Sequence, residues 1–236
     1  MTAATAYWVV VPAAGCGQRM GATVPKQYLP LAGRTVLAWT LDTLLAHPRV
    51  AGVVLAVAAD DARWRDAVAP AHAARVRPVV GGSERADSVE AGLELLAAER
   101  PADEWVLVHD AVRPCVHPGD IERLVSTLEG DEVGGLLAAL CSDTIKQADA
   151  GSRVGATPDR RTLWRALTPQ MFRLGELRAA YARARAADRV PTDESAAIES
   201  GGMRPRLVAG RNDNVKITRT EDLVLAEAIL RARGPL

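Results

Sequence analysis

The sequence has few cysteines, a single phenylalanine and no excess of charge of either sign. Its 236 residues include 29 Lys and Arg against 29 Asp and Glu, so the formal net charge is zero. Such a chain has no overall field to hold a nucleic-acid backbone, so we expect no DNA or RNA partner, although a local basic pocket for a small phosphate stays open. Cys16, Cys115 and Cys141 are scattered and form no C-x-x-C pair. This pattern fits a reducing cytoplasm and indicates neither a disulfide framework nor a zinc site.

Long apolar runs are also missing. The longest, Gly52 to Ala59, is far shorter than the ~20 residues that a membrane span requires. The first residues carry no basic segment, and the apolar run Tyr7–Pro12 is too short for the core of a signal peptide. We therefore expect a cytoplasmic protein with no membrane partner.

What the sequence does have is a regular alternation of strand-like and helix-like segments. Continuous apolar runs predict strands at Tyr7–Pro12, Gly52–Ala58, Arg75–Val80, Trp105–Val108 and Val133–Leu140. Helical spacing of apolar residues predicts helices at Thr35–Leu45, Arg85–Ala98, 121–128, Gly175–Ala187, Asp193–Glu199 and Glu221–Ala232. This order predicts an α/β fold, a Rossmann-like, mostly parallel sheet with helices on both faces.

The alternation breaks between Cys141 and Pro169. This stretch is polar, contains Gly151, Gly155 and Pro158, and follows neither the helical nor the strand period. A long irregular insertion in a compact domain is usually functional or an interaction arm. We therefore expect a single domain over residues 1–236 with an inserted arm at about 141–169.

The first segment with chemical meaning follows the first predicted strand. A loop of small residues is followed by Arg19 and Lys26. Small residues let backbone N–H groups approach a phosphate, and the two cations then neutralise its charge. A dinucleotide fingerprint would need glycine where Met20 stands, and a Walker A loop would need a Gly-Lys-Ser/Thr sequence that this chain lacks. The pattern favours a triphosphate-binding loop.

The second segment is the pair Gly81-Gly82, which comes between a predicted strand and a predicted helix. Paired glycines there make a ledge at which a base or ribose can touch the backbone. Taken alone, Ser83 is better explained as the N-cap of the helix. Ser88 is expected on the exposed side of the first turns, available to a ligand.

The third segment contains Asp110, at the carboxyl end of a predicted strand, where open α/β sheets bind ligands. A single carboxylate there is a natural Mg²⁺ ligand, since magnesium takes one or two protein oxygens together with phosphates and water. A turn-forming aspartate is the simpler alternative. His109 is expected to be packed and hydrogen-bonded, and Arg113 to hold either an anion or Asp110 itself.

The fourth segment contains Asp213 and Lys216. Asp213 is a candidate second metal ligand, and Lys216 is either a site cation or an ion-pairing surface lysine. Thr144, Arg160 and Thr168 would each be assigned to the surface if taken singly. No Ser/His/Asp or Cys/His arrangement is present in the pattern, which disfavours acyl transfer.

Taken together, these segments resemble the 2-C-methyl-D-erythritol 4-phosphate cytidylyltransferases of the non-mevalonate isoprenoid pathway. The similar pieces follow one another in order through most of the chain. They are Pro12-Ala13-Ala14-Gly15-x-Gly17-x-Arg19-Met20, Pro25-Lys26-Gln27-Tyr28, Gly81-Gly82 through Arg85 to Ser88-Val89, His109-Asp110-Ala111-x-Arg113-Pro114, Asp143-Thr144-x-Lys146, Thr168-Pro169-Gln170, Thr192-Asp193-Glu194 and Asn214-Val215-Lys216-Ile217-Thr218.

The resemblance implies a nucleotidyltransferase fold, Mg²⁺ dependence, and a homodimer in which an arm reaches into the partner's active site. It implies that CTP and a polyol phosphate, methylerythritol phosphate, give CDP-methylerythritol and pyrophosphate. Arg19 and Lys26 would stabilise the transition state at the α-phosphate, and Asp110 would hold the metal. Lys216, with Arg160 and Thr144 from the partner's arm, would position the acceptor. The remaining candidates for ligand binding are Ala13, Ala14, Gly15, Gly81, Gly82, Ser88, Arg113 and Thr168.

Three alternatives stay open from the sequence. A ribitol-5-phosphate cytidylyltransferase would share the CTP loop and differ in the acceptor pocket and arm. A sugar nucleotidyltransferase using UTP or a deoxythymidine triphosphate is less favoured. A catalytically silent nucleotide-binding regulator is disfavoured because Arg19, Lys26, Asp110 and Lys216 are all present.

Overall fold

The computed structural model describes residues 5–15 and 24–234. A seven-stranded sheet crosses the molecule in the order β11-β7-β10-β6-β1-β4-β5. Its strands are β1 (Tyr7–Pro12), β4 (Val50–Val57), β5 (Val76–Val80), β6 (Trp105–Val108), β7 (Gly134–Leu140), β10 (Trp164–Arg173) and β11 (Arg206–Ala209). Of these described strands, β10 alone runs antiparallel to its neighbours. The predicted mostly parallel sheet is therefore confirmed.

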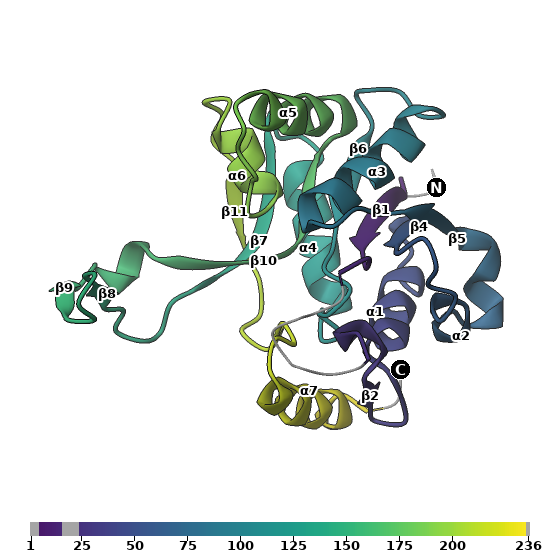
Figure 1. Ribbon diagram of the computed structural model, residues 1–236, viewed down its shortest axis with the longest axis horizontal. Helices are drawn as coiled ribbons and strands as arrows, with labels where there is room; N and C mark the ends of the chain where they lie inside the picture. The colour runs from purple at the N-terminus through teal and green to yellow at the C-terminus, as the bar shows by residue number, and fades with distance from the viewer. Residues whose placement is uncertain (1–4, 16–23, 235–236) are drawn as a thin grey trace.

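Helices cover both faces of this sheet (Figure 1). On one face lie α1 (Val36–Leu45) and α4 (Pro118–Leu128); on the other lie α3 (Arg85–Ala97), α5 (Leu174–Ala186) and α6 (Glu194–Glu199). Successive side chains of a strand point to opposite faces, so Val9 and Val11 pack in the cluster with α1 and α4, whereas Val10 packs with α3 and α5. Because both faces are buried at the centre of the sheet, β1, β4, β6 and β7 are nearly continuous apolar runs.

Smaller elements complete the fold. They are α2 (Trp64–Ala67), α7 (Thr220–Ala232), the 3-10 helices η2 (Lys26–Tyr28), η3 (Pro70–Arg75) and η4 (Arg160–Thr162), and the paired short strands β2 (Pro30–Leu31) with β3 (Arg34–Thr35) and β8 (Gln147–Ala148) with β9 (Val154–Ala156). A third apolar cluster, which includes Leu31, Ile217 and Leu230, packs α7 against the β2–β3 hairpin. Within the described ranges, no helix is long and apolar enough to cross a membrane.

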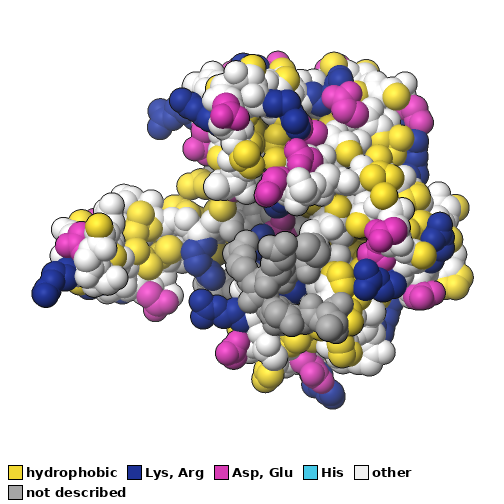
Figure 2. Space-filling model, in the orientation of Figure 1, with side chains coloured by type: hydrophobic (Ala, Val, Ile, Leu, Met, Phe, Trp, Pro, Cys, Tyr) yellow, Lys and Arg dark blue, Asp and Glu magenta, His cyan; other side chains and the backbone are white. Residues whose placement is uncertain are grey.

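The segment between β7 and β10 projects from the body of the molecule (Figures 1 and 2). Its tip is the β8–β9 pair. The expected carboxyl end at residue 169 is wrong, because Trp164 already pairs with Leu140 of β7, and Gln170 to Arg173 pair with β6 on the other side. The projecting arm therefore ends at about residue 163, and Thr168 belongs to the interior of the sheet.

Candidate functional site

Asp110 is the centre of a buried cluster of charges at the carboxyl end of β6. It is 5% exposed. Its Oδ1 lies 3.0 Å from Arg85 Nε, and its Oδ2 lies 2.9 Å from Lys216 Nζ and 3.3 Å from Arg113 Nε. Burial alone would raise the pKa of Asp110, but the charges of Arg85, Lys216 and Arg113 outweigh it and hold the pKa well below its usual range. Asp110 is therefore ionised at every physiological pH.

Three segments far apart in the sequence supply these cations. Arg85 is the first residue of α3, Arg113 lies in the loop after β6, and Lys216 lies in the segment before α7. Arg113 also donates to the backbone oxygen of Asn214 at 2.8 Å, so its guanidinium points inward. The whole residue is 8% exposed. Of the two roles predicted for Arg113, the geometry supports the one in which it holds Asp110.

His109 and Thr168 fix the backbone at Asp110. The backbone N–H of Asp110 donates to Thr168 Oγ1 at 3.1 Å. The hydroxyl of Thr168 lies 3.0 Å from His109 Nδ1, and His109 Nε2 lies 3.2 Å from the backbone oxygen of Arg113. Burial lowers the pKa of His109 to about 4, so the neutral ring accepts from Thr168 at Nδ1 and donates from Nε2. His109 is packed and hydrogen-bonded as predicted, and Thr168 is a buried support of Asp110.

The small-residue loop lies beside this centre and is held by a buried glutamine. Ala13 donates its N–H to the backbone oxygen of Ala56 at 2.7 Å, so this amide already belongs to the sheet. Gln27 Nε2 donates to the backbone oxygens of Ala13 at 2.7 Å and Gly15 at 3.4 Å. Ala14 is half-buried and Gly15 is exposed. Gln27 thus sets the direction of the peptide groups that lead into the loop.

Two predicted catalytic cations belong to the same region. Lys26 is half-buried at the first position of η2, next to Gln27. Arg19 lies outside the described residues. The described part of the loop ends at Gly15 and consists of small residues. Small residues let a ligand approach the backbone closely, so this part of the loop fits a site for a phosphate chain.

If the ligand is CTP, as the resemblance implies, we expect Gln27→Met to raise its KM by about tenfold, because two backbone oxygens lose a donor worth about 1–2 kcal/mol. Methionine keeps the length of the side chain, so the change tests the hydrogen bonds. Steady-state kinetics with each substrate varied in turn would check this. An increase confined to the KM of the acceptor would contradict the assignment.

The Gly81-Gly82 turn brings β5 against the loop. A Cβ on Gly81 would lie 2.7 Å from Ser88 Oγ and 2.8 Å from Ala14 Cβ, so no side chain fits there. Two predictions on this segment are wrong. Glu84, and not Ser83, is the N-cap of α3. Ser88 is 2% exposed, because this small residue packs beneath the glycine turn, with its hydroxyl 3.3 Å from the backbone oxygen of Glu84.

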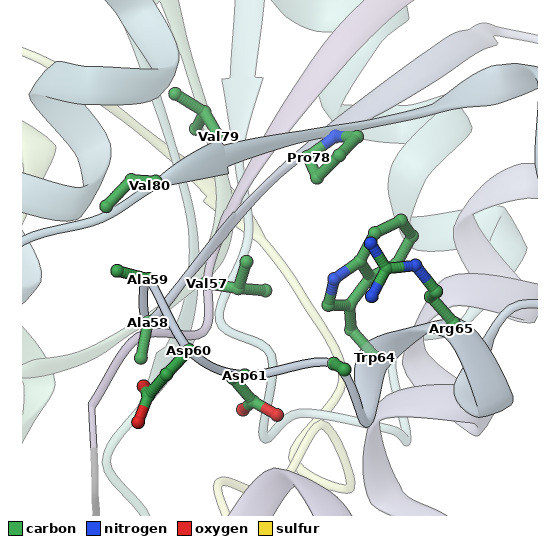
Figure 3. A pocket seen from close by; sticks show the side chains of 11 residues that line it. Val57, Ala58, Ala59, Asp60, Asp61, Trp64, Arg65, Pro78, Val79 and Val80 are labelled. Atoms are coloured by element: carbon green, nitrogen blue, oxygen red, sulfur yellow. The ribbon is translucent and has the colours of Figure 1, made fainter.

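A hollow of about 290 Å³ lies at the carboxyl ends of β4 and β5 (Figure 3). Asp60 and Asp61 follow β4 on one side of it, and Val80 ends β5 on the other. A neighbouring hollow of about 430 Å³ shares both aspartates and reaches Ala14 and Gln27. Arg63 pairs with Asp61 at 3.0 Å, which leaves Asp60 as the carboxylate of this region without a cation partner among the ion pairs of the described residues. Three cations surround Asp110, so that centre is the more favourable place for a phosphate chain.

Asp213 is placed differently from its prediction. Its carboxylate lies 2.9 Å from Arg211 Nη2 and 2.9 Å from Arg233 Nη2. Burial alone would raise the pKa of Asp213, but these two arginines lower it to about 2. The carboxylate thus ties the segment before α7 to the end of that helix, and this geometry does not support a second magnesium ligand.

Thr144 and Arg160 lie exposed on the arm. Arg160 donates to the backbone oxygen of Ser142 at 2.8 Å. Of the acceptor-binding residues predicted from the sequence, Lys216 contacts Asp110. Thr144 and Arg160 belong to the arm, which projects from the body of the molecule (Figure 1).

Comparisons with known proteins identify the family. A family model described as 2-C-methyl-D-erythritol 4-phosphate cytidylyltransferase matches residues 7–232. The chain belongs to this cytidylyltransferase family. A member from Pseudomonas putida (strain W619) is 54% identical over 219 residues, which cover 92% of this chain and 93% of the relative. A member from Pseudomonas aeruginosa (strain UCBPP-PA14) is 53% identical over 222 residues, 93% of this chain and 94% of the relative.

Solved structures of cytidylyltransferases share the fold. The enzyme of that description from Francisella tularensis has a TM-score of 0.81 at 33% identity, covering 95% of this chain and 100% of its own. The one from Thermus thermophilus has a TM-score of 0.77 at 30% identity, covering 96% of this chain and 100% of its own. The Rossmann-like nucleotidyltransferase fold predicted from the resemblance is therefore confirmed.

Four residues of this cytidylyltransferase contribute to the site although the sequence reasoning gave them no role. Gln27 holds the loop, Arg85 contacts Asp110, Asn214 donates to the backbone oxygen of Thr168 at 2.8 Å, and Glu194 pairs with Arg85. All four lie inside the family motifs. Their place in a motif could therefore have marked these four residues as candidates. A motif does not show, however, which distant residue each side chain contacts.

Proposed function

We propose that this protein transfers the cytidylyl group of CTP to 2-C-methyl-D-erythritol 4-phosphate and releases pyrophosphate. Membership of the family carries the proposal. The cluster around Asp110 supports it, because Arg85, Arg113 and Lys216 bring three positive charges to one carboxylate beside a loop of small residues. Such a site suits a reaction in which two phosphate-bearing substrates must be brought together.

The reaction joins a phosphate oxygen of the acceptor to the α-phosphorus of CTP, and the bond from that phosphorus to the β-phosphate oxygen breaks. A phosphate monoester has a second pKa near 6, so the attacking oxygen is largely ionised at neutral pH. No general base is needed. Lys26, Arg19 and Lys216 would offset the repulsion between the substrates, align the attack and stabilise the charge that develops on the α-phosphoryl oxygens.

Asp110 is the residue that would hold Mg²⁺. Among the described residues, no group of three or more His, Cys, Asp or Glu side chains is placed to hold a metal ion. The donor chemistry nevertheless fits, because Asp110 is ionised and magnesium commonly takes one or two carboxylates together with substrate phosphates. When bound, Mg²⁺ would neutralise phosphate charge and favour departure of pyrophosphate.

We further propose a homodimer in which Thr144 and Arg160 complete the acceptor site of the partner subunit. Two observations support this. Both residues are exposed on the arm, and the arm projects from the body of the molecule (Figure 1). Apolar side chains are exposed on the arm (Figure 2), among them Ile145 and Val154, and Trp164 is exposed beside it at the start of β10. A partner subunit would cover these side chains.

The decisive experiment is pyrophosphate release from CTP and Mg²⁺ with either methylerythritol phosphate or D-ribitol 5-phosphate as the acceptor. We expect turnover with methylerythritol phosphate and at least about 100-fold lower kcat/KM with ribitol phosphate, since its longer, unbranched chain lacks the methyl group and places its hydroxyls differently in the site. Chelation of the metal with EDTA should abolish the rate, and added Mg²⁺ should restore it. A preference for ribitol phosphate would reassign the acceptor, and no release with either would contradict the enzyme function.

A further inference from the structure

Glu194 is a fully buried acid that the reaction outlined above does not use. It is the first residue of α6 and is 0% exposed. Arg85 donates to it through both terminal nitrogens, at 2.7 Å to Oε1 and 3.1 Å to Oε2, and Tyr181 donates its hydroxyl to Oε1 at 2.9 Å. A buried charge is costly to desolvate, so Glu194 depends on Arg85 and Tyr181 to offset that cost.

Arg85 connects Glu194 to the centre of the site. While its terminal nitrogens bind Glu194, its Nε lies 3.0 Å from Oδ1 of Asp110. A guanidinium is planar, so a carboxylate bound bidentately at one edge fixes the direction of the remaining N–H. An arginine guanidinium keeps its positive charge in proteins. Arg85 therefore stays charged and oriented.

The pairing divides the oxygens of Asp110 between two sides. Arg85 takes Oδ1, whereas Lys216 and Arg113 contact Oδ2. Lys216 is the most exposed of the three cations, with 39% of its side chain accessible against 26% for Arg85 and 10% for Arg113, so the Oδ2 side is the more open to a substrate phosphate or a cation. Glu194, acting through Arg85, sets which oxygen faces that side.

Strand β10 holds Glu194 in place. Gln170 Nε2 donates to Asp193 Oδ2 at 3.0 Å, and Gln170 Oε1 accepts from the backbone N–H of Ser195 at 2.8 Å. Both partners flank Glu194 at the start of α6. Thr168, on the same strand, accepts from the backbone of Asp110. The motifs Thr168-Pro169-Gln170 and Thr192-Asp193-Glu194 thus hold the two ends of one connected set of contacts.

We propose that Glu194 is a positioning residue for cytidylyl transfer, acting through Arg85 on Asp110, with Tyr181 and Gln170 as its supports. The inference rests on the proposed function. Helix α6 contributes no predicted ligand-binding residue. The proposal nevertheless gives it control over how Asp110 presents Oδ2.

The test is Glu194→Gln, compared with Glu94→Gln as a matched control. Glu94 also forms a two-point pair with an arginine of α5, at 2.9 and 2.6 Å from Arg178, but on the surface. For Glu194→Gln we expect kcat to fall and the Mg²⁺ concentration at half-maximal rate to rise, each by about 10- to 100-fold, as for other residues that orient a metal-binding group. Glu94→Gln should change neither value by more than about twofold.

The paired readouts separate positioning from folding. Thermal unfolding followed by circular dichroism shows whether Glu194→Gln is folded, and a merely structural role would lower the active fraction without changing the Mg²⁺ requirement. An unchanged Mg²⁺ requirement in folded Glu194→Gln would overturn the inference. If that variant does not fold, Tyr181→Phe keeps the ion pair and removes one hydrogen bond, and it should raise the Mg²⁺ requirement by about fivefold; no change would also overturn the inference.

The same experiment also tests the proposed function separately from the Glu194 inference. Wild-type turnover with methylerythritol phosphate tests the function independently of any variant. If calorimetry shows that the wild type binds Mg²⁺–CTP but the enzyme does not turn over, the acceptor assignment fails. The Glu194 inference is then tested by binding alone: Glu194→Gln should weaken the binding of Mg²⁺–CTP by about 10- to 100-fold, and unchanged binding would overturn it.

Discussion

Replacement of Asp110 by asparagine should lower kcat by about 100- to 1,000-fold, because the site would lose the fixed negative charge that organises its cations. Asparagine keeps the size of the side chain and leaves Arg85, Arg113 and Lys216 close together without their common partner. Breaking a buried ion pair in this way should also lower the free energy of unfolding by about 3 kcal/mol. Steady-state kinetics and urea unfolding would measure the two effects.

Glu129→Gln is the control for this variant. Glu129 pairs with Arg49 and accepts from the hydroxyl of Tyr7 at 2.7 Å. Tyr7 begins β1, so this pair lies at the amino ends of the parallel strands, whereas Asp110 lies at their carboxyl ends. Glu129→Gln should lower stability while leaving kcat within about twofold of the wild type. An Asp110→Asn enzyme that unfolds more easily but turns over normally would remove Asp110 from the catalytic site.

Mixing two inactive variants should restore activity. Lys26→Ala removes a cation from the body, Arg160→Ala removes one from the arm, and each alone should lower turnover by about 100-fold or more. If each site combines the body of one subunit with the arm of the other, a mixed dimer has one intact site and one doubly altered site. A 1:1 mixture after subunit exchange should therefore recover about a quarter of the wild-type rate per chain.

The mixing experiment needs evidence that the subunits exchange. Labelling one variant with a donor fluorophore and the other with an acceptor would report mixed dimers through energy transfer. Energy transfer without recovered turnover would contradict a shared site. Circular dichroism of each variant would establish that Lys26 and Arg160 can be changed without loss of the fold.

The sequence predicts the central parallel strands well because they are buried on both faces, but it does not predict the parallel edge strand β11, which is mostly exposed. The bounds of β1 and β6 agree with the prediction, and those of β4 differ by at most two residues. Strand β10 was not predicted, because Thr168, Pro169 and Gln170 interrupt its apolar pattern. Their polar groups are satisfied by Asp110, Asn214 and α6, and such distant partners do not appear in local periodicity.

The candidate site shows the same limit. Asp110 could be selected from its position after a strand, and Lys216 from its motif, but their 2.9 Å contact depends on how the chain folds. Ser88 was expected to face a ligand because it is a hydroxyl among apolar residues. It is buried because the adjacent glycine turn leaves room only for a small side chain beneath it. Local pattern thus finds candidate residues, whereas tertiary packing decides their roles.

The arm connects two interior strands of the sheet. These strands, β7 and β10, are the second and third in the order β11-β7-β10-β6-β1-β4-β5, and each has a neighbouring strand on both sides. A projection attached to an edge strand could move by peeling that strand away, whereas the strands that carry this one are hydrogen-bonded on both sides. The arm is thus continuous with β10, the strand from which Thr168 and Gln170 contact Asp110 and the start of α6.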